Sequence, residues 1–347
     1  MAVDERVKHV FVCGLHRSGT TALARCISEL RDCTAFENTG VPKDEGQHLQ
    51  DVYPPENAYG GPGRFGFSRG AHLTENSPLL TPANISKLRA SWDAHWDQSK
   101  AVRVEKTPSN LLKARFLQAA FPNSYFVVIR RHPVAVSLAT QKWTPTTLNR
   151  LFEHWLLCHE TFGQDRAFLS HVHELKYEEF VADPQKHLKQ IAEFIGIDFA
   201  GVSEQLVDKE CNARYIDRWA QMLHSPVFGR YYHRLARMYE DRFAAHGYSV
   251  TEFIGGRPFE TLKRNFLCRV ADASFYPVAD VWRASRLEHG RRKTITGLPT
   301  TLLRVCRLEL LRVGLIASVK PVPTYRPRVQ SRTVGSRPET GAHSFGL

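Results

Sequence analysis

The chain has 347 residues, 42% of them hydrophobic, which is enough for one large α/β domain with an appendage or for two domains. It contains no run of about 18 apolar residues, which argues against a membrane-spanning helix. The 7 cysteines are scattered and form no C-x-x-C pair, so neither a disulfide framework nor a zinc site is indicated. Because the N-terminus enters the first expected strand without an apolar leader, we expect a cytoplasmic protein with reduced thiols.

The formal net charge of +12 is concentrated at the C-terminal end, where residues 257–347 hold 17 Lys and Arg against 6 Asp and Glu. Within this part, leucines and arginines of residues 298–319 share helical spacing. They predict an amphipathic helix that either packs on the folded domain or lies on an anionic membrane surface or another polyanion. We therefore expect a folded domain at 1–256, a basic, mainly helical extension at 257–320 and a disordered tail at 321–347.

A glycine-bounded turn near the N-terminus has the features of an anion-binding loop. The apolar run 10–13 predicts a buried β-strand, apolar spacing after Gly19 predicts a helix, and Gly14–Thr21 lies between them. The glycines let backbone amides converge on one anion at the helix start. Side chains add hydroxyl donors and one cation: Ser18, Thr20, Thr21 and Arg17. A Walker loop carries lysine at the position of Thr20, so this loop suits a phosphate ester other than Mg-ATP.

The rest of the folded part alternates strands and helices. Strands are predicted at 32–37, 101–108, 124–129 and 171–177, and helices at 81–99, 109–120, 133–142, 147–162, 183–195 and 225–246. This order predicts an α/β fold, a three-layer P-loop-like core with a central parallel sheet and helices on both faces. Ligands of such sheets bind at the carboxyl ends of the strands. The polar segment 38–69 is long and irregular, which favours a lid or substrate wall.

A second cationic site follows the predicted central strand at 124–129. Arg130 and Arg131 end that strand, and Ser137 lies in the next helix. Two cationic sites at one sheet edge indicate a ligand with two separated phosphates. Glu37 and Lys106 also fall at strand ends, so we expect them at the same edge.

Together these motifs resemble those of the sulfotransferases that use 3′-phosphoadenosine 5′-phosphosulfate (PAPS). Arg17–Thr21 resembles their 5′-phosphosulfate loop, Glu105–Pro108 the strand end with an assisting lysine, and Arg131–Pro133 with Ser137 the 3′-phosphate site. The segment 177–184 is similar to one found in carbohydrate and protein sulfotransferases. The resemblance covers residues 10–248. It implies sulfuryl transfer from PAPS to a hydroxyl or amine, without a metal requirement.

The resemblance also implies roles for single residues. Those expected to hold PAPS are Arg17, Ser18, Gly19, Thr20, Thr21, Arg130, Arg131 and Ser137. The interval from Arg131 to Ser137 is shorter than in the family, so Thr140 is an alternative to Ser137. Arg17 and Lys106 would stabilise the leaving phosphate. Glu37 is the first candidate for the base that activates the acceptor, with Glu45 and His48 as rivals.

Several alternatives stay open at this stage. We expect a small-molecule or glycan acceptor such as a carbohydrate or glycolipid, although a protein tyrosine is not excluded. Nucleic acid is not expected, because the excess charge lies outside the folded part and is not interleaved with aromatic residues. No metal is expected, because the 16 histidines lack ligand spacing. The rival functions are a P-loop kinase or other nucleotide phosphotransferase, and a non-catalytic membrane- or polyanion-binding adaptor.

Overall fold

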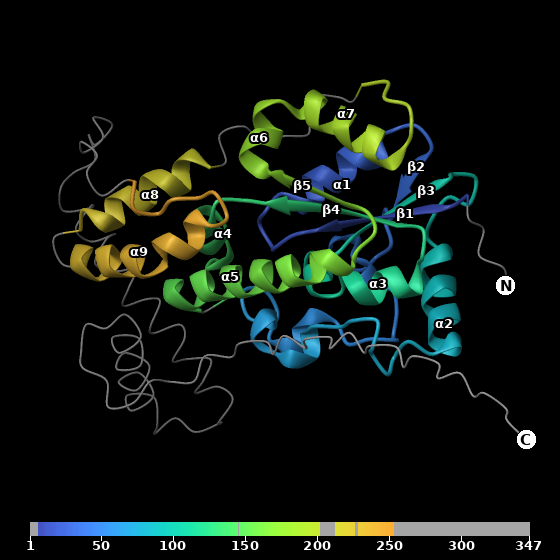
Figure 1. The fold of residues 1–347 in the computed structure, drawn as a ribbon, viewed down its shortest axis with the longest axis horizontal. Coiled ribbons are helices and arrows are strands. Elements are labelled where there is room, and N and C mark those ends of the chain that lie inside the picture. Colours follow the sequence, from blue (N-terminus) through green and yellow to red (C-terminus); the bar gives the residue numbers. More distant parts are fainter. Residues whose placement is uncertain (1–5, 145, 202–211, 226–227, 253–347) are drawn as a thin grey trace, which may run out of the picture.

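Five parallel strands form a single sheet in the order β2-β3-β1-β4-β5, with helices on both faces (Figure 1). The computed structural model describes residues 6–144, 146–201, 212–225 and 228–252. The strands are β1 (Lys8–Cys13), β2 (Cys33–Ala35), β3 (Val102–Lys106), β4 (Ser124–Arg130) and β5 (Val172–Lys176). The predicted α/β core with its central parallel sheet is confirmed. Because β1 lies between β3 and β4, the loop that follows it opens at the middle of the sheet.

The described helices connect these strands or pack beside them. They are α1 (Thr20–Ser28), α2 (Pro82–Asp93), α3 (Ala114–Ala120), α4 (Pro133–Thr140), α5 (Leu148–Asp165), α6 (Tyr177–Ala182), α7 (Pro184–Ile195), α8 (Ala213–Leu223) and α9 (Gly229–Ala244). Short 3₁₀ turns occupy much of the predicted irregular segment 38–69, including η1 (Pro42–Asp44), η2 (Gly46–His48) and η3 (Glu56–Tyr59). This segment therefore has local structure, although it forms neither a long helix nor a strand.

Alternation along the strands divides the core into two clusters. Phe11 of β1 and Phe126 of β4 pack with residues of α2, α3, α4, α5, α8 and α9, whereas Val10 and Val127 pack with residues of α1, α6 and α7. All four side chains are fully buried. Continuous apolar runs are typical of strands covered on both faces, which is why the sequence predicts β1 and β4 well.

Other predicted elements differ at their ends. Residues 32–37 form a strand only at Cys33–Ala35, and the helix predicted at 81–99 ends at Asp93. The helix predicted at 109–120 begins instead as a 3₁₀ turn at Pro108–Leu112, because Lys113 leaves helical backbone angles before α3 starts. Helices α6 and α8 were not predicted.

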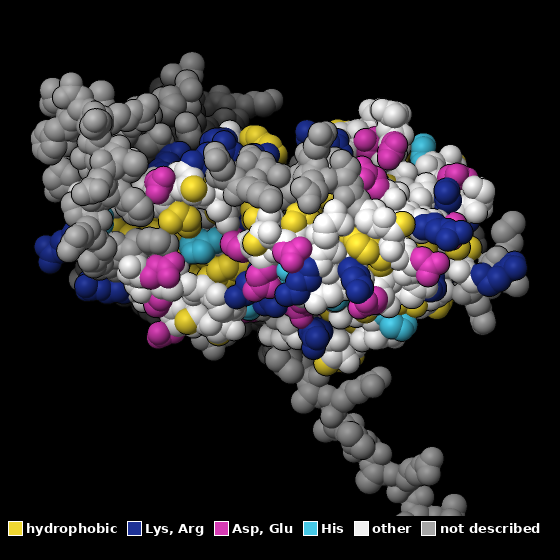
Figure 2. All heavy atoms as spheres, turned by 90° about the horizontal axis from the view of Figure 1, so that it is seen from above, with side chains coloured by type: hydrophobic (Ala, Val, Ile, Leu, Met, Phe, Trp, Pro, Cys, Tyr) yellow, Lys and Arg dark blue, Asp and Glu magenta, His cyan; other side chains and the backbone are white. Residues whose placement is uncertain are grey.

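The expected C-terminal extension, its amphipathic helix at 298–319, the tail at 321–347 and the boundary at 256 lie outside the described residues. Among the described helices, none is both long and apolar enough to cross a membrane. On the face seen in Figure 2, basic and acidic side chains of the described residues are interspersed. This face of the described part therefore carries no continuous basic patch of the kind that a polyanion would need.

We predict that Phe11→Ala lowers the free energy of unfolding by about 3–5 kcal/mol, because it leaves a cavity in the central strand. Urea denaturation of the purified protein measures this change. Phe168, whose side chain is 49% exposed, provides the control. Phe168→Ala should cost less than about 1 kcal/mol, and an equal loss in both variants would contradict the assigned core.

Candidate active site

One pocket of about 910 Å³ opens at the carboxyl edge of the sheet. It is lined by residues from both cationic motifs and from the segment 38–69. The lining includes Arg17, Gly19, Thr20, Thr21, Glu37, Glu45, His48, Lys106 and Arg131, together with His16, Glu56, Trp143 and Tyr177. Most of the predicted site residues therefore meet in one place, although they are far apart in the sequence.

The loop after β1 has a backbone shape that its sequence explains. Gly19, which precedes α1, has a φ of 94°, and a Cβ there would lie 2.6 Å from the Tyr177 ring. Arg17 adopts a left-handed conformation as well, with a φ of 68°, which is costly for a residue with a side chain. The first amides of α1 have no acceptor within the helix, so this end attracts anions. The hydroxyl of Ser18 is buried and has no hydrogen-bond partner in the part of the chain that the structure describes.

Arg131 joins the second cationic motif to this loop. Its Nη1 donates to the backbone carbonyl of Arg17 at 2.7 Å, and its Nε donates to Oδ1 of Asn212 at 2.6 Å. The guanidinium also stacks on Tyr177, 4.2 Å from the ring centroid. Its third nitrogen, Nη2, is buried and has no hydrogen-bond partner among the described residues. One donor of a buried cation is thus left available at a pocket wall.

The Arg17 side chain lies at the exposed side of the pocket. Its guanidinium is 4.5 Å from the ring centroid of Trp143, and Trp143 is 53% exposed. A large aromatic side chain so open to solvent is unusual, and the stacking holds Arg17 over the pocket.

A buried ion pair occupies the other half of the pocket. Lys106 Nζ lies 2.9 Å from Oε1 of Glu45, and both side chains are 7% exposed. Lys106 also donates to the carbonyl of Lys43 at 3.2 Å, and Gln47 donates to the second carboxylate oxygen of Glu45 at 2.7 Å. The predicted assisting lysine and one predicted base are therefore direct partners.

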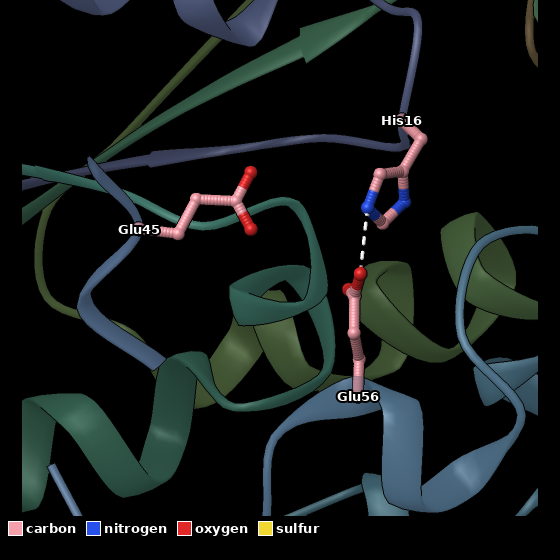
Figure 3. Close-up of side chains that lie close together, drawn as sticks. All are labelled: His16, Glu45 and Glu56. Atoms are coloured by element: carbon pink, nitrogen blue, oxygen red, sulfur yellow. Dashed lines mark ion pairs between the residues drawn. The ribbon is translucent and has the colours of Figure 1, made fainter. Parts of the chain in front are cut away.

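The sequence did not reveal a second acid–base pair, formed by His16 and Glu56. His16 Nε2 lies 2.7 Å from Oε1 of Glu56 (Figure 3). Burial acts to raise the pKa of Glu56, but His16 and the nearby Lys113 outweigh it and hold that pKa below its usual value. Glu56 is therefore an anion at neutral pH. No periodic pattern marks this contact, because a 3₁₀ turn supplies Glu56.

Among the described residues, His16, Glu45 and Glu56 form a group that could hold a metal ion, since one ligand atom from each lies within 4.8 Å of the others (Figure 3). Both carboxylates already face cationic or proton-donating partners, Lys106 for Glu45 and His16 for Glu56. Each of the two carboxylates therefore already has a partner within the protein.

Four predicted residues lie differently from the rest. Ser137 and Thr140 line a separate cavity of about 10 Å³ with His16, and both hydroxyls are buried without partners. Arg130 pairs with Glu174 at 2.6 Å. Among the predicted site residues, all of which the structure describes, Ser18, Arg130, Ser137 and Thr140 do not line the large pocket.

The two remaining candidates for the base line the large pocket: Glu37 is exposed and His48 is half-buried. The roles given to all the predicted site residues stay predictions.

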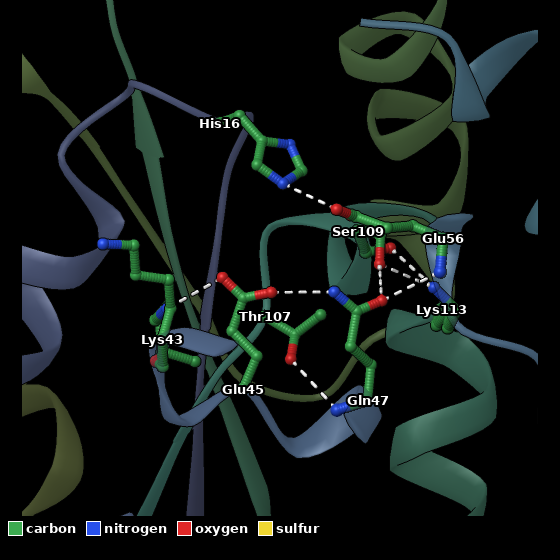
Figure 4. Close-up of polar contacts among 9 residues, drawn as sticks. His16, Lys43, Glu45, Gln47, Glu56, Thr107, Ser109 and Lys113 are labelled. Carbon is green, nitrogen blue, oxygen red and sulfur yellow. Dashed lines mark hydrogen bonds and ion pairs between the residues drawn. The ribbon is translucent and has the colours of Figure 1, made fainter. Parts of the chain in front are cut away.

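A chain of hydrogen bonds runs from the pocket into the core (Figure 4). Gln47 accepts from the backbone amide of Glu56 at 2.9 Å and from the Ser109 hydroxyl at 3.4 Å, and Lys113 donates to that hydroxyl at 2.9 Å. Lys113 is fully buried. Burial lowers the pKa of Lys113 to about 8, although Glu56 and Glu105 act to raise it.

This shift predicts a pH-dependent stability. Because the unfolded chain binds the Lys113 proton more tightly, the cost of burying it is full below pH 8 and declines as the pH rises toward the ordinary pKa of 10.5. Relative to Lys113→Met, the wild type should gain up to about 3 kcal/mol of unfolding free energy across that range. Denaturant titrations between pH 7 and pH 10 test this, and parallel pH profiles of the two proteins would refute it.

Comparisons with known proteins address the family of the chain. Residues 9–201 match the profile of the Sulfotransferase family. No curated protein matches the chain. Among solved structures, a sulfotransferase from Alicyclobacillus acidocaldarius is similar at 15% identity, covering 61% of this chain and 91% of its own, with a TM-score of 0.39. Sulfotransferase STF1 from Mycobacterium tuberculosis H37Rv is similar at 15% identity, covering 60% and 70%, with a TM-score of 0.35.

These two structural scores are too low to add to the argument, whereas the family profile covers more than half of the chain. The loop after β1, Lys106 and Arg131 all lie within the matched residues and line one pocket. The chain therefore belongs to the sulfotransferase family.

Proposed function

We propose that this protein transfers the sulfuryl group of PAPS to a hydroxyl or amine of a polar acceptor. The main support for this proposal is a hydrogen bond. Nη1 of Arg131 donates to the backbone carbonyl of Arg17, which brings the two expected phosphate sites together at one pocket. The unpartnered Nη2 of Arg131 is available there to an anionic ligand.

In this proposal the two ends of PAPS bind to different parts of the pocket. The 5′-phosphosulfate lies on the loop of Ser18, Gly19, Thr20 and Thr21 at the start of α1. Ser18 does not line the pocket, so its buried hydroxyl would have to reach this group from outside the lining. Arg131 binds the 3′-phosphate. Arg130 and Ser137, which were expected beside Arg131, would have to reach that phosphate from outside the described pocket lining.

The reaction has three parts. The acceptor oxygen or nitrogen forms a bond to sulfur, the bond from sulfur to the 5′-phosphate oxygen breaks, and the acceptor loses a proton. Arg17 and Lys106 stabilise the negative charge that develops on the leaving 3′-phosphoadenosine 5′-phosphate (PAP). A base takes the proton.

Glu37, Glu45 and His48 remain the candidates for that base, because each lines the pocket. Glu45 is also the partner of Lys106, and its Oε1 would become free when Lys106 turns to the donor. The His16–Glu56 pair lies beside Glu45 and could pass a proton onward.

The acceptor is a carbohydrate or glycolipid in this proposal. The pocket lining includes carboxylates that can accept hydrogen bonds from sugar hydroxyls, among them Glu37, Asp44 and Glu45. Hydrogen bonding to Thr39 holds the pKa of Asp44 below its usual value, so this group is an acceptor at neutral pH. A cytoplasmic location and an anionic membrane partner stay predictions from the sequence.

Calorimetric titration with PAP tests the donor site. PAP should bind equally well with EDTA and with Mg²⁺, and Arg131→Ala should weaken it about 10- to 100-fold by removing a charge-assisted contact. Arg166, whose Nε pairs with Glu174 at 2.7 Å, supplies a matched control, because it does not line the pocket. Arg166→Ala should change the affinity less than about threefold.

If Arg131→Ala unfolds, Arg131→Lys keeps the charge and should show a smaller loss. If the wild type does not bind PAP but binds ATP with Mg²⁺, the function of a P-loop kinase or other nucleotide phosphotransferase is favoured. Binding of neither would favour the adaptor.

Transfer of radiolabelled sulfate from PAPS to a panel of oligosaccharides, phenols and amines tests the base. Among Glu37→Gln, Glu45→Gln and His48→Gln, one should lower transfer about 100-fold or more while PAP still binds. Sustained transfer in all three variants would remove every candidate predicted from the sequence.

A further inference from the structure

The end of β3 holds the pocket segment 43–47 through three consecutive side chains. Glu105 Oε1 accepts from the amide of Gly46 at 2.9 Å, Lys106 binds Glu45 and the Lys43 carbonyl, and Thr107 Oγ1 accepts from the amide of Gln47 at 3.4 Å. Figure 4 includes the contact between Thr107 and Gln47. Lys106 belongs to the proposed chemistry, whereas Glu105 does not line the pocket.

Gly46 is the point of closest approach between the two segments. A Cβ on Gly46 would lie 2.6 Å from Oε1 of Glu105, so only glycine permits this contact. The carbonyl of Gly46 accepts from the indole nitrogen of Trp92 at 3.0 Å. Glu105 is 1% exposed and Trp92 is fully buried. Two side chains of the core thus fix the backbone on both sides of Gly46.

We propose that Glu105 is a positioning residue that sets the geometry of the Glu45–Lys106 pair by anchoring Gly46. The proposal rests on the sulfuryl transfer argued above. Glu45 directly precedes Gly46, and Lys106 directly follows Glu105. One hydrogen bond between Glu105 and Gly46 therefore fixes the backbone beside both members of the pair, so its loss displaces them relative to each other.

The anchor depends on the charge of Glu105. Its carboxylate accepts from three donors, namely the Gly46 amide, the Thr107 hydroxyl and the Asn110 amide. Burial raises the pKa of Glu105 to about 7, against the effect of these hydrogen bonds and of Lys106. A neutral carboxyl accepts hydrogen bonds more weakly than a carboxylate, so protonation of Glu105 weakens its contacts with these donors. The anchor is therefore strongest where Glu105 is charged and weakens as the pH falls through about 7.

Other titratable groups act on Glu105 from the elements packed against it. Those on β1, η2, β3 and the neighbouring turns are Cys13, Glu45, Tyr53, Lys106 and Lys113. Burial raises the pKa of both Cys13 and Tyr53, so neither ionises near neutral pH. Burial lowers the pKa of Lys113 to about 8, and Glu105→Gln separates any effect of Lys113 from that of Glu105.

The indole N–H signal of Trp92 in NMR spectra reports on the anchor without any ligand. Trp92→Phe identifies the signal. In the wild type this signal should shift with a midpoint near pH 7, and Glu105→Gln should abolish the transition. Asp165→Asn is the matched control, since Asp165 is 2% exposed, is bound to Arg115 and does not line the pocket. This control should titrate as the wild type does.

Gly46→Ala gives a second route if Glu105→Gln does not fold. It pushes the segment away from Glu105 and removes no titratable group. Its Trp92 signal should be displaced at all pH values. A wild-type signal that does not titrate, or the same transition in Glu105→Gln, would overturn the anchor.

Activity measurements separate the anchor from the proposed function. Glu105→Gln should keep PAP affinity within about fivefold, because Arg17 and Arg131 do not contact it, while transfer from PAPS falls about 10- to 100-fold through misplacement of the pair. Asp165→Asn should keep both. Unchanged transfer in Glu105→Gln would overturn the positioning role. A wild type that binds no PAP would overturn the proposed function, and the Trp92 titration would still decide whether Glu105 anchors Gly46.

Discussion

The hydrogen bond from the Arg131 guanidinium to the carbonyl of Arg17 is the contact on which the pocket depends. It ties the end of β4 to the loop after β1, and the sheet order makes this possible by placing these strands side by side. A buried guanidinium needs several acceptors, and here a carbonyl, an amide oxygen and an aromatic face supply them. The remaining nitrogen has no partner within the described protein. An anion is the ligand that would complete this set.

The opposite half of the pocket is stabilised differently. Its buried charges occur as pairs, Lys106 with Glu45 and His16 with Glu56. Buried pairs of this kind contribute little to folding, because desolvation offsets most of their attraction. Such pairs fix the positions of their side chains. The bonds from the Gly46 amide to Glu105 and from Gln47 to Glu45 stabilise these positions. The pocket therefore combines the unpaired nitrogen of Arg131 with carboxylates that already have partners.

The sequence predicted the sheet because its central strands are continuous apolar runs, and β1 and β4 are fully buried along most of their length. It also predicted which motifs meet, since parallel strands share one carboxyl edge. Trp92 and Trp96, which lie in the segment predicted as a helix at 81–99, belong to the core. Helix α8 was missed, although Tyr215, Trp219 and Met222 mark its buried face with helical spacing.

The pairings inside the pocket could not be read from the sequence. Glu45 and Lys106 are 61 positions apart, and Glu56 reaches His16 from an irregular segment without periodicity. Ser137 and Thr140 were alternatives because the interval from Arg131 to Ser137 is shorter than in the family. In the structure both line the same small cavity. Side-chain direction at such positions follows from tertiary packing, which no local pattern encodes.

The left-handed backbone of Arg17 has a consequence for recognition. A strained conformation persists only where its surroundings enforce it, and here Arg131 and the turn to Gly19 do so before any ligand arrives. The loop is thus preorganised, and binding of a ligand to it costs little conformational entropy. The cost of this conformation falls on folding and not on binding. The strain at Arg17 that favours binding therefore lowers the stability of the folded protein without ligand.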